Sequence, residues 1–263
     1  KLLDQPQHNF NTSPPTYKEI LNIVMKMKSS GSSCPFDQIS IIVLKRCPIL
    51  RTALLRLIVY CWEMRELPRV WKQGFTILIY KKGKNDNPEN FRPITLEPIC
   101  AKVFTSLLRN RIYTYLLQNE YIETDIQKGF WSGISGTVEH TELLSHMINH
   151  ARRYQRSMVV TLLDLRNAFG EVDHNLIQSV LDYHHIPNTV KNLVSELYKD
   201  YTISIGTKSF TTNPIYVRKG VLQGDCLSPL LFNMCFNTLI KCIEHEKIKM
   251  IGYCFSDSLQ PRH

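Results

Sequence analysis

The strongest constraint on the fold is the run at residues 158–163, which is apolar except for one Thr and ends directly at Asp164. Such a run predicts a β-strand, and its lack of polar alternation predicts that both faces of the strand are covered. A second string, at residues 220–229, contains a Gln-Gly turn followed by Ser228 and Pro229, which is typical of a helix cap and first helical position. The two strings therefore place the most informative polar residues at a strand end and at a turn that starts a helix.

The order of the expected elements predicts an α+β fold. Helical spacing covers residues 17–28, 50–67, 99–117, 136–154, 174–184, 187–200 and 228–246, and strand patterns cover residues 74–80, 158–163, 201–206, 214–218 and 248–255. From residue 158 to 255 the order is strand, helices, hairpin, helix and strand. This order favours helices packed on one face of an antiparallel sheet.

Composition bears mainly on the partner. The chain has 32 Lys and Arg against 23 Asp and Glu, a net charge of +9 that favours a polyanion, although many basic proteins bind no nucleic acid. Its eight cysteines form no C-x-x-C pair and several lie in apolar runs, so we expect reduced thiols in an intracellular protein of the nucleus or cytoplasm. We expect no membrane span and no signal peptide, and the start at Lys1 suggests an internal piece of a longer protein.

Asp164 has two interpretations. Phosphoryl transfer from a nucleoside triphosphate uses hard oxygen ligands for Mg²⁺, so a carboxylate at a buried strand end is a candidate metal ligand. A turn or helix-cap Asp is the alternative, and it is common at strand ends.

Phe169 and Gln223 also fit a nucleotide site. Five residues after Asp164, the ring of Phe169 could lie beneath a nucleotide sugar and clash with a 2′-hydroxyl, although most single Phe residues are core aromatics. Gly224 permits close approach of a ligand to the backbone. A tight strand-to-helix turn would explain Gly224 equally well, but it gives no reason for Gln223.

Basic residues form two candidate phosphate contacts. The first is a hairpin-like element with Lys81, Lys82 and Arg92, because arginine forks match phosphate oxygens. The second is the cluster of Arg152, Arg153 and Arg156, which could follow a template backbone. Solvated charged surface is the alternative for the lysines, and a cation-rich helix end is the alternative for the arginines. A zinc site at His140, His146 and His150 is disfavoured because no Cys or acidic ligand follows at matching spacing.

Five strings in order resemble those of reverse transcriptases of non-LTR (LINE-type) retrotransposons. They are residues 75–82, 90–96, 127–130, 163–169 and 220–233. The resemblance implies a right-hand polymerase with an N-terminal extension at 1–16, a fingers-like region at 17–155 and a partial palm at 156–263. It also implies an RNA template, a DNA primer and deoxynucleoside triphosphates as partners, with no membrane.

The resemblance assigns roles residue by residue. Asp164 resembles a catalytic ligand of two Mg²⁺ ions, or of Mn²⁺, and Leu165 offers a backbone carbonyl. Phe169 resembles the sugar-discriminating aromatic, and Gln223 with Gly224 resembles the lining of the nucleotide and template strand. Arg92 with Lys81 or Lys82 resembles the triphosphate clamp.

The chain departs from the family pattern in three places. Asp37 lies in an altered turn, Gly170 stands where an Asp is usual, and the 263 residues contain no F/Y-x-D-D motif. We expect that acidic pair to follow just past His263, so that residues 1–263 alone would be inactive and prone to aggregate. Two other hypotheses stay open: an inactive remnant that binds nucleic acid, and a polymerase like that of a group II intron maturase.

Overall fold

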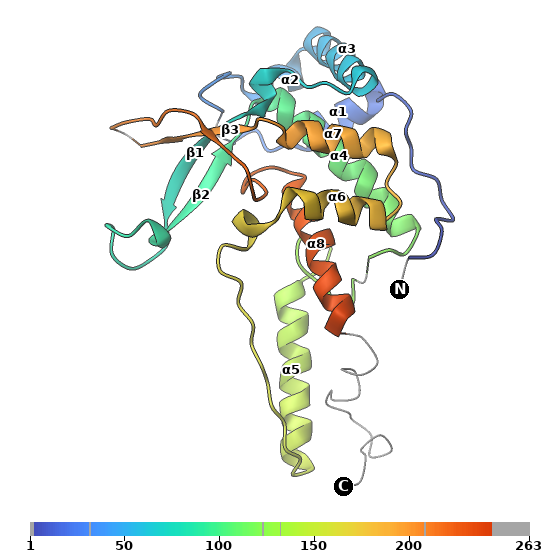
Figure 1. Cartoon of the computed structure of the whole chain (residues 1–263), viewed down its shortest axis with the longest axis vertical. Helices are drawn as coiled ribbons and strands as arrows, with labels where there is room; N and C mark the ends of the chain where they lie inside the picture. The colour runs from blue at the N-terminus through green and yellow to red at the C-terminus, as the bar shows by residue number, and fades with distance from the viewer. Residues whose placement is uncertain (1–2, 32, 123, 132, 208, 244–263) are drawn as a thin grey trace. The chain divides into compact units, whose positions relative to one another are not determined.

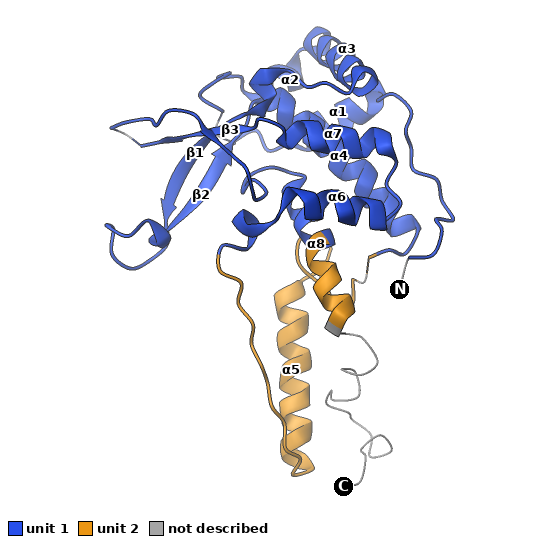
Figure 2. Cartoon of the chain, viewed as in Figure 1, with its two compact units in different colours: residues 1–121, 167–234 blue, residues 122–166, 235–263 orange. Residues whose placement is uncertain are grey.

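The computed structural model describes residues 3–31, 33–122, 124–131, 133–207 and 209–243. The chain divides into two compact units (Figure 2). One comprises Lys1–Tyr121 with Asn167–Met234, and the other comprises Ile122–Arg166 with Cys235–His263. The sheet lies in the first unit, and α5 lies in the second.

Helices and a small sheet make up the described secondary structure, which confirms the mixed helix-and-strand class (Figure 1). The α-helices are α1 (Tyr17–Lys26), α2 (Ile41–Arg46), α3 (Pro48–Met64), α4 (Ile99–Gln118), α5 (Gly136–Arg153), α6 (His174–Tyr183), α7 (Asn188–Tyr198) and α8 (Ser228–Ile243). The 3-10 helices are η1 (Arg69–Lys72), η2 (Pro88–Asn90) and η3 (Ala168–Glu171), and the strands are β1 (Gln73–Tyr80), β2 (Phe91–Leu96), β3 (Thr202–Gly206) and β4 (Ile215–Tyr216).

The sheet is mixed, with the strand order β2-β1-β3-β4. β1 pairs with β2 in antiparallel register, Thr76 opposite Thr95, and β3 pairs with β4 as the predicted hairpin. β1 and β3, however, are parallel, with Gly74 opposite Ile203. The antiparallel sheet was predicted for residues 158–255, so the pairing of β3 with β1, which lies before that range, was not part of the prediction. Parallel pairing needs a long crossover, and the chain from α4 to α7 supplies one.

The core of the first unit is built around α4, which packs against α1 and also contacts η1. Its side chains Val103, Phe104, Leu108 and Ile112 have no solvent exposure. α6 and α7 bury a second apolar set through the helical spacing expected from the sequence: Ile177, Val180, Leu181, Val190, Leu193, Val194 and Leu197. The spacing of apolar residues thus correctly predicted the buried faces of α6 and α7.

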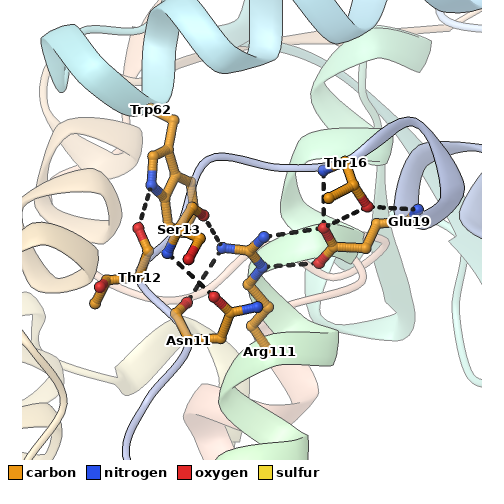
Figure 3. Close-up of polar contacts among 7 residues, drawn as sticks. All are labelled: Asn11, Thr12, Ser13, Thr16, Glu19, Trp62 and Arg111. Atoms are coloured by element: carbon orange, nitrogen blue, oxygen red, sulfur yellow. Dashed lines mark hydrogen bonds and ion pairs between the residues drawn. The ribbon is translucent and has the colours of Figure 1, made fainter.

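Arg111 on α4 joins three parts of the first unit (Figure 3). Its guanidinium donates two hydrogen bonds to the Glu19 carboxylate, at 2.9 and 3.0 Å, and one to the Ser13 carbonyl at 2.6 Å. It also lies 4.7 Å from the ring centroid of Trp62. Burial alone would raise the pKa of Glu19, but the hydrogen bonds from Arg111 and from Thr16 outweigh it and lower that pKa. A forked ion pair thus holds the N-terminal segment against α1 and α4.

Residues 158–163 do not form the predicted strand. They lie in the second unit without regular secondary structure, and Val159, Leu162 and Leu163 are 90%, 86% and 79% exposed. A β-strand is stabilised by a hydrogen-bonded neighbour, and no described segment pairs with this run. The expectation that both of its faces are covered is therefore wrong in this structure. The strand predicted at 248–255 falls outside the described residues.

The second unit is organised by α5. Lys128 makes an ion pair of 2.6 Å with Glu139, and the Lys128 backbone and side chain pack closely against Gly136. A pocket of about 610 Å³ lies beside this contact and is lined in part by Gln127 and Phe130, from one of the five strings. Among the residues that the structure describes, no helix is long and apolar enough to cross a membrane, and every described cysteine is a free thiol.

Candidate functional site

The turn at Gln223 and Gly224 rests on the backbone of β2. Thr95 donates its amide to the Gln223 carbonyl at 2.8 Å. Gly224 has a φ of +131°, and a Cβ there would lie 2.4 Å from the Thr95 carbonyl oxygen. Only glycine combines that backbone conformation with that close approach. The predicted close-approach role of Gly224 thus has a specific partner in β2, while the residue itself stays exposed.

α8 begins at Ser228, the first residue of the predicted helix at 228–246. The buried Asp225 provides the oxygen expected of the cap. Its Oδ2 accepts hydrogen bonds from the Leu227 amide at 3.1 Å, the Ser228 amide at 3.0 Å and the Ser228 hydroxyl at 3.1 Å. The first amides of a helix lack partners within the helix, and Asp225 therefore ties the turn to α8.

Phe169 belongs to the same part of the first unit as the turn. Val221 donates its amide to the Phe169 carbonyl at 2.8 Å, and Gly220 donates to the Val172 carbonyl at 2.7 Å. The Phe169 ring stacks on that of Phe232 in α8, with centroids 5.0 Å apart. The structure therefore brings together Phe169, from one sequence string, and the turn and helix of the other.

The predicted phosphate-binding cations lie at the far end of the β1–β2 hairpin. Lys81, Lys82 and Arg92 are all exposed. Lys81 follows β1 and donates its amide to the Asn90 carbonyl at 2.7 Å, and Arg92 pairs across the ladder with Ile79. Residues 79 and 81 share one face of a strand, so Lys81 and Arg92 are diagonal neighbours on that face.

β2 connects these cations to the turn. Arg92 and Thr95 are both within β2, which places them about 10 Å apart along the strand at ~3.3 Å per residue. The hairpin therefore carries charge at one end and holds Gln223 and Gly224 at the other. Sequence reasoning missed Thr95 and Phe232, because neither residue type signals a contact with a distant turn.

Asp37 anchors the altered turn after α1. Its Oδ2 accepts the Ile99 amide at the start of α4 at 2.8 Å, and its Oδ1 accepts the Ile39 amide at 3.2 Å. A cavity of about 210 Å³ lies beside this loop and reaches Gly224 and Lys102. The loop after α1 and the Gln223–Gly224 turn therefore line the same cavity.

The remaining predicted residues lie in the second unit. Asp164 and Leu165 are exposed, in the segment that forms no strand. Arg152 and Arg153 are exposed in the last turn of α5, where cations are favoured by the helix dipole, and Arg156 is partly buried after it. Within the described part of the chain, no three His, Cys, Asp or Glu side chains are arranged to hold a metal ion.

Comparison with known proteins gives a consistent picture. Residues 79–258 match the family model described as reverse transcriptase (RNA-dependent DNA polymerase). The chain is 33% identical over 224 residues to a retrovirus-related Pol polyprotein from the type-1 retrotransposable element R2 of Popillia japonica, covering 80% of this chain and 30% of that protein.

Two further relatives come from other insects. A corresponding R2 polyprotein of Nasonia vitripennis is 29% identical over 187 residues, covering 71% of this chain and 18% of that protein. A probable RNA-directed DNA polymerase from transposon BS of Drosophila melanogaster is 27% identical over 235 residues, covering 87% and 25%. The chain thus spans less than a third of the length of these relatives.

Proposed function

Because this chain belongs to the reverse transcriptase family, we propose that it forms the nucleotide-binding part of an RNA-directed DNA polymerase of a non-LTR retrotransposon. The observation that carries the proposal is the junction of Phe169 with the segment that contains Gln223 and Gly224. The proposed substrates are deoxynucleoside triphosphates, and the proposed partners are an RNA template and a DNA primer inside the cell. We assign residues 17–155 to a fingers region and 156–263 to part of a palm, in a right-hand polymerase.

The junction supports a nucleotide pocket. Phe169 is partly exposed, and its ring is held flat against Phe232. We propose that a nucleotide sugar lies against the exposed part of this ring, where a 2′-hydroxyl would clash. Gly224 is exposed and presents backbone without a side chain. Gln223, with its backbone fixed on β2, is proposed to contact the nucleotide and the template strand.

The exposed cations support binding of phosphates. Arg92 can fork onto triphosphate oxygens, and Lys81 on the same face adds a point charge, with Lys82 beside it. We propose that Arg152, Arg153 and Arg156 contact the template backbone, where each neutralised phosphate adds salt-sensitive affinity.

A metal pair, Mg²⁺ or Mn²⁺, is proposed for the complete polymerase, where it would neutralise charge on the triphosphate. Asp164 is accessible and can supply one carboxylate, and the Leu165 carbonyl can supply a second oxygen. The described residues gather no further ligands. By themselves they do not fit a two-metal site.

Primer extension by the natural protein that contains these residues tests the proposal. With an RNA template, deoxynucleotides and Mg²⁺, Asp164→Asn should abolish extension. Arg92→Ala should raise the KM for deoxynucleotides by about tenfold, because a charged hydrogen bond is worth ~1.5 kcal/mol or more. Phe169→Val should increase incorporation of ribonucleotides relative to deoxynucleotides. Arg56→Ala removes an exposed charge from α3 and should change none of these values.

The second candidate function is binding of nucleic acid by a catalytically inactive protein. It is favoured by the exposed cations, which are accompanied by a single proposed metal-binding carboxylate. Salt-dependent binding of a primer–template without extension by the natural protein would favour this alternative and contradict the polymerase.

Residues 1–263 alone should also fail to extend a primer, because only one of the three carboxylates that the family resemblance implies is present. Robust extension by this piece would contradict the need for all three carboxylates.

A further inference from the structure

Two acidic side chains are buried beneath the Gln223–Gly224 turn. Glu97 follows β2 and is 3% exposed, and Asp225 precedes α8 and is 5% exposed. Neither has a role in the nucleotide contacts proposed above. Two neighbouring carboxyl groups away from water are costly unless each oxygen finds a donor.

The hydrogen bonds leave one oxygen of each carboxyl without a donor. Asp225 Oδ2 accepts from Leu227 and Ser228, and Glu97 Oε1 accepts from the Tyr201 hydroxyl at 3.3 Å. Among the described residues, Glu97 Oε2 and Asp225 Oδ1 are both buried and have no hydrogen-bond partner. Glu97 lines the same cavity as Gly224 and Cys226, the two chain neighbours of Asp225, and Asp225 raises the pKa of Glu97. One proton carried between them would supply the missing donor.

The surroundings favour that proton on Glu97. Burial raises the pKa of Glu97 well above its ordinary value and the Asp225 charge raises it further, while Lys102 and Tyr201 act in the opposite direction. Burial also raises the pKa of Asp225, but its hydrogen bonds from Ser228 favour the charged form. The pair is therefore best satisfied as a carboxylic acid at Glu97 that donates to a carboxylate at Asp225.

We propose that Glu97 is a positioning residue which, in its protonated form, donates a hydrogen bond to Asp225 and so holds the Gln223–Gly224 turn between β2 and α8. The part of this inference that concerns nucleotide binding rests on the proposed function; the hydrogen bond and its effect on the turn do not. Glu97 lies two residues after Thr95, whose amide donates to the Gln223 carbonyl. Asp225 directly follows Gly224. The hydrogen bond between Glu97 and Asp225 is therefore a second link between the end of β2 and the Gln223–Gly224 turn.

The link depends on pH in a defined direction. The pKa of Glu97 is raised in the folded protein, so the unfolded chain releases this proton first as the pH rises. The stability that Glu97 contributes is complete below its ordinary pKa of 4.5 and falls as the pH rises towards the folded value. The titratable groups that face Glu97 are Asp225 and Cys226 before α8, Lys102 on α4 and Tyr201 before β3. Only Lys102 stabilises the charged form by its charge.

Hydrogen–deuterium exchange of residues 1–263 tests the proposal when it is combined with thermal unfolding between pH 5 and 8. Glu97→Gln keeps a donor without a titrating proton. In this variant the amides of residues 227 and 228 should stay as protected from exchange as in the wild type. The difference between its thermal unfolding midpoint and that of the wild type should increase in favour of the variant as the pH rises. Glu97→Ala should exchange these amides about tenfold faster throughout, as expected for loss of one buried hydrogen bond. Glu66→Gln is the control for removal of an exposed acid.

Three outcomes would overturn the proposal. They are equal loss of protection in Glu97→Gln and Glu97→Ala, the same pH dependence in wild type and Glu97→Gln, and unchanged protection in Glu97→Ala. Asp225→Asn removes the ionised acceptor and should expose the same amides at every pH; retained protection would also count against the pair. These readouts need no nucleotide. A separate deoxynucleotide-binding measurement on the same variants therefore distinguishes failure of this inference from failure of the proposed function.

Discussion

The ring of Phe169 lies on the ring of Phe232 with centroids 5.0 Å apart and planes 11° from parallel. Phe169 is the second residue of the 3-10 helix η3, and Phe232 lies in the second turn of α8. The position of the proposed sugar-contacting ring is thus set by the helix that follows the Gln223–Gly224 turn. A substitution of either ring should therefore alter the positions of both η3 and α8.

The stack should contribute a measurable coupling energy. A double-mutant cycle of Phe169→Leu and Phe232→Leu should give about 1 kcal/mol of interaction free energy, the usual value for an aromatic pair beyond its burial. Chemical unfolding of residues 1–263 measures it. Strictly additive effects of the two substitutions would show that the rings do not support each other.

Gly224→Ala should destabilise the first unit by about 2 kcal/mol or more. Its backbone lies in a region that disfavours side chains, and the new Cβ would meet the Thr95 carbonyl oxygen at 2.4 Å. Gly129→Ala is the matched control, because a Cβ there meets nothing within 4 Å. The thermal midpoints of the two variants should differ clearly, and equal midpoints would contradict the close approach.

Arg111→Lys should destabilise the protein by about 3 kcal/mol, because lysine cannot fork onto Glu19 or lie flat against Trp62. The ion pair also predicts a pH dependence. The pKa of Glu19 is lowered in the folded state, so its contribution is present above the ordinary value of 4.5 and is lost as the pH falls below it. Urea unfolding from pH 3 to pH 7 should therefore show a shallower acid dependence in the Lys variant. An unchanged slope would refute the role of the pair.

Local signals predicted local structure well. Thr16 and Glu19 have the three-residue spacing of a capping box, and both of its hydrogen bonds are present. Thr16 Oγ1 accepts the Glu19 amide, and Glu19 Oε2 accepts the Thr16 amide. The spacing of apolar residues also located α6 and α7. A short helix such as α2 was missed, because six residues between turns give too few repeats to show a period.

Contacts between distant segments could not be predicted in this way. The run at 158–163 has the composition of a strand, but composition does not supply a pairing partner. Glu97 lies between Leu96 and Pro98, where nothing in the local pattern shows that it is buried beside Gly224 and Cys226. The sequence predicted that Gly224 allows another group to approach its backbone closely. Only the structure shows that this group is the Thr95 carbonyl of β2. The polymerase roles of Asp164, Gln223 and Arg92 remain predictions.

The exposed run at 158–163 should be a site of aggregation in residues 1–263. Val159, Leu162 and Leu163 bury little surface, so replacing Leu162 and Leu163 by Ser should leave the unfolding midpoint within about 0.5 kcal/mol of the wild type. The same change should slow concentration-dependent aggregation, since it interrupts an extended apolar segment that lacks a strand partner. Light scattering during incubation measures this effect. Leu193→Ser alters a side chain with no exposure and should instead unfold the protein. A strong loss of stability in the Leu162 and Leu163 variant would show that the run is covered after all, and would restore the strand that the sequence predicts.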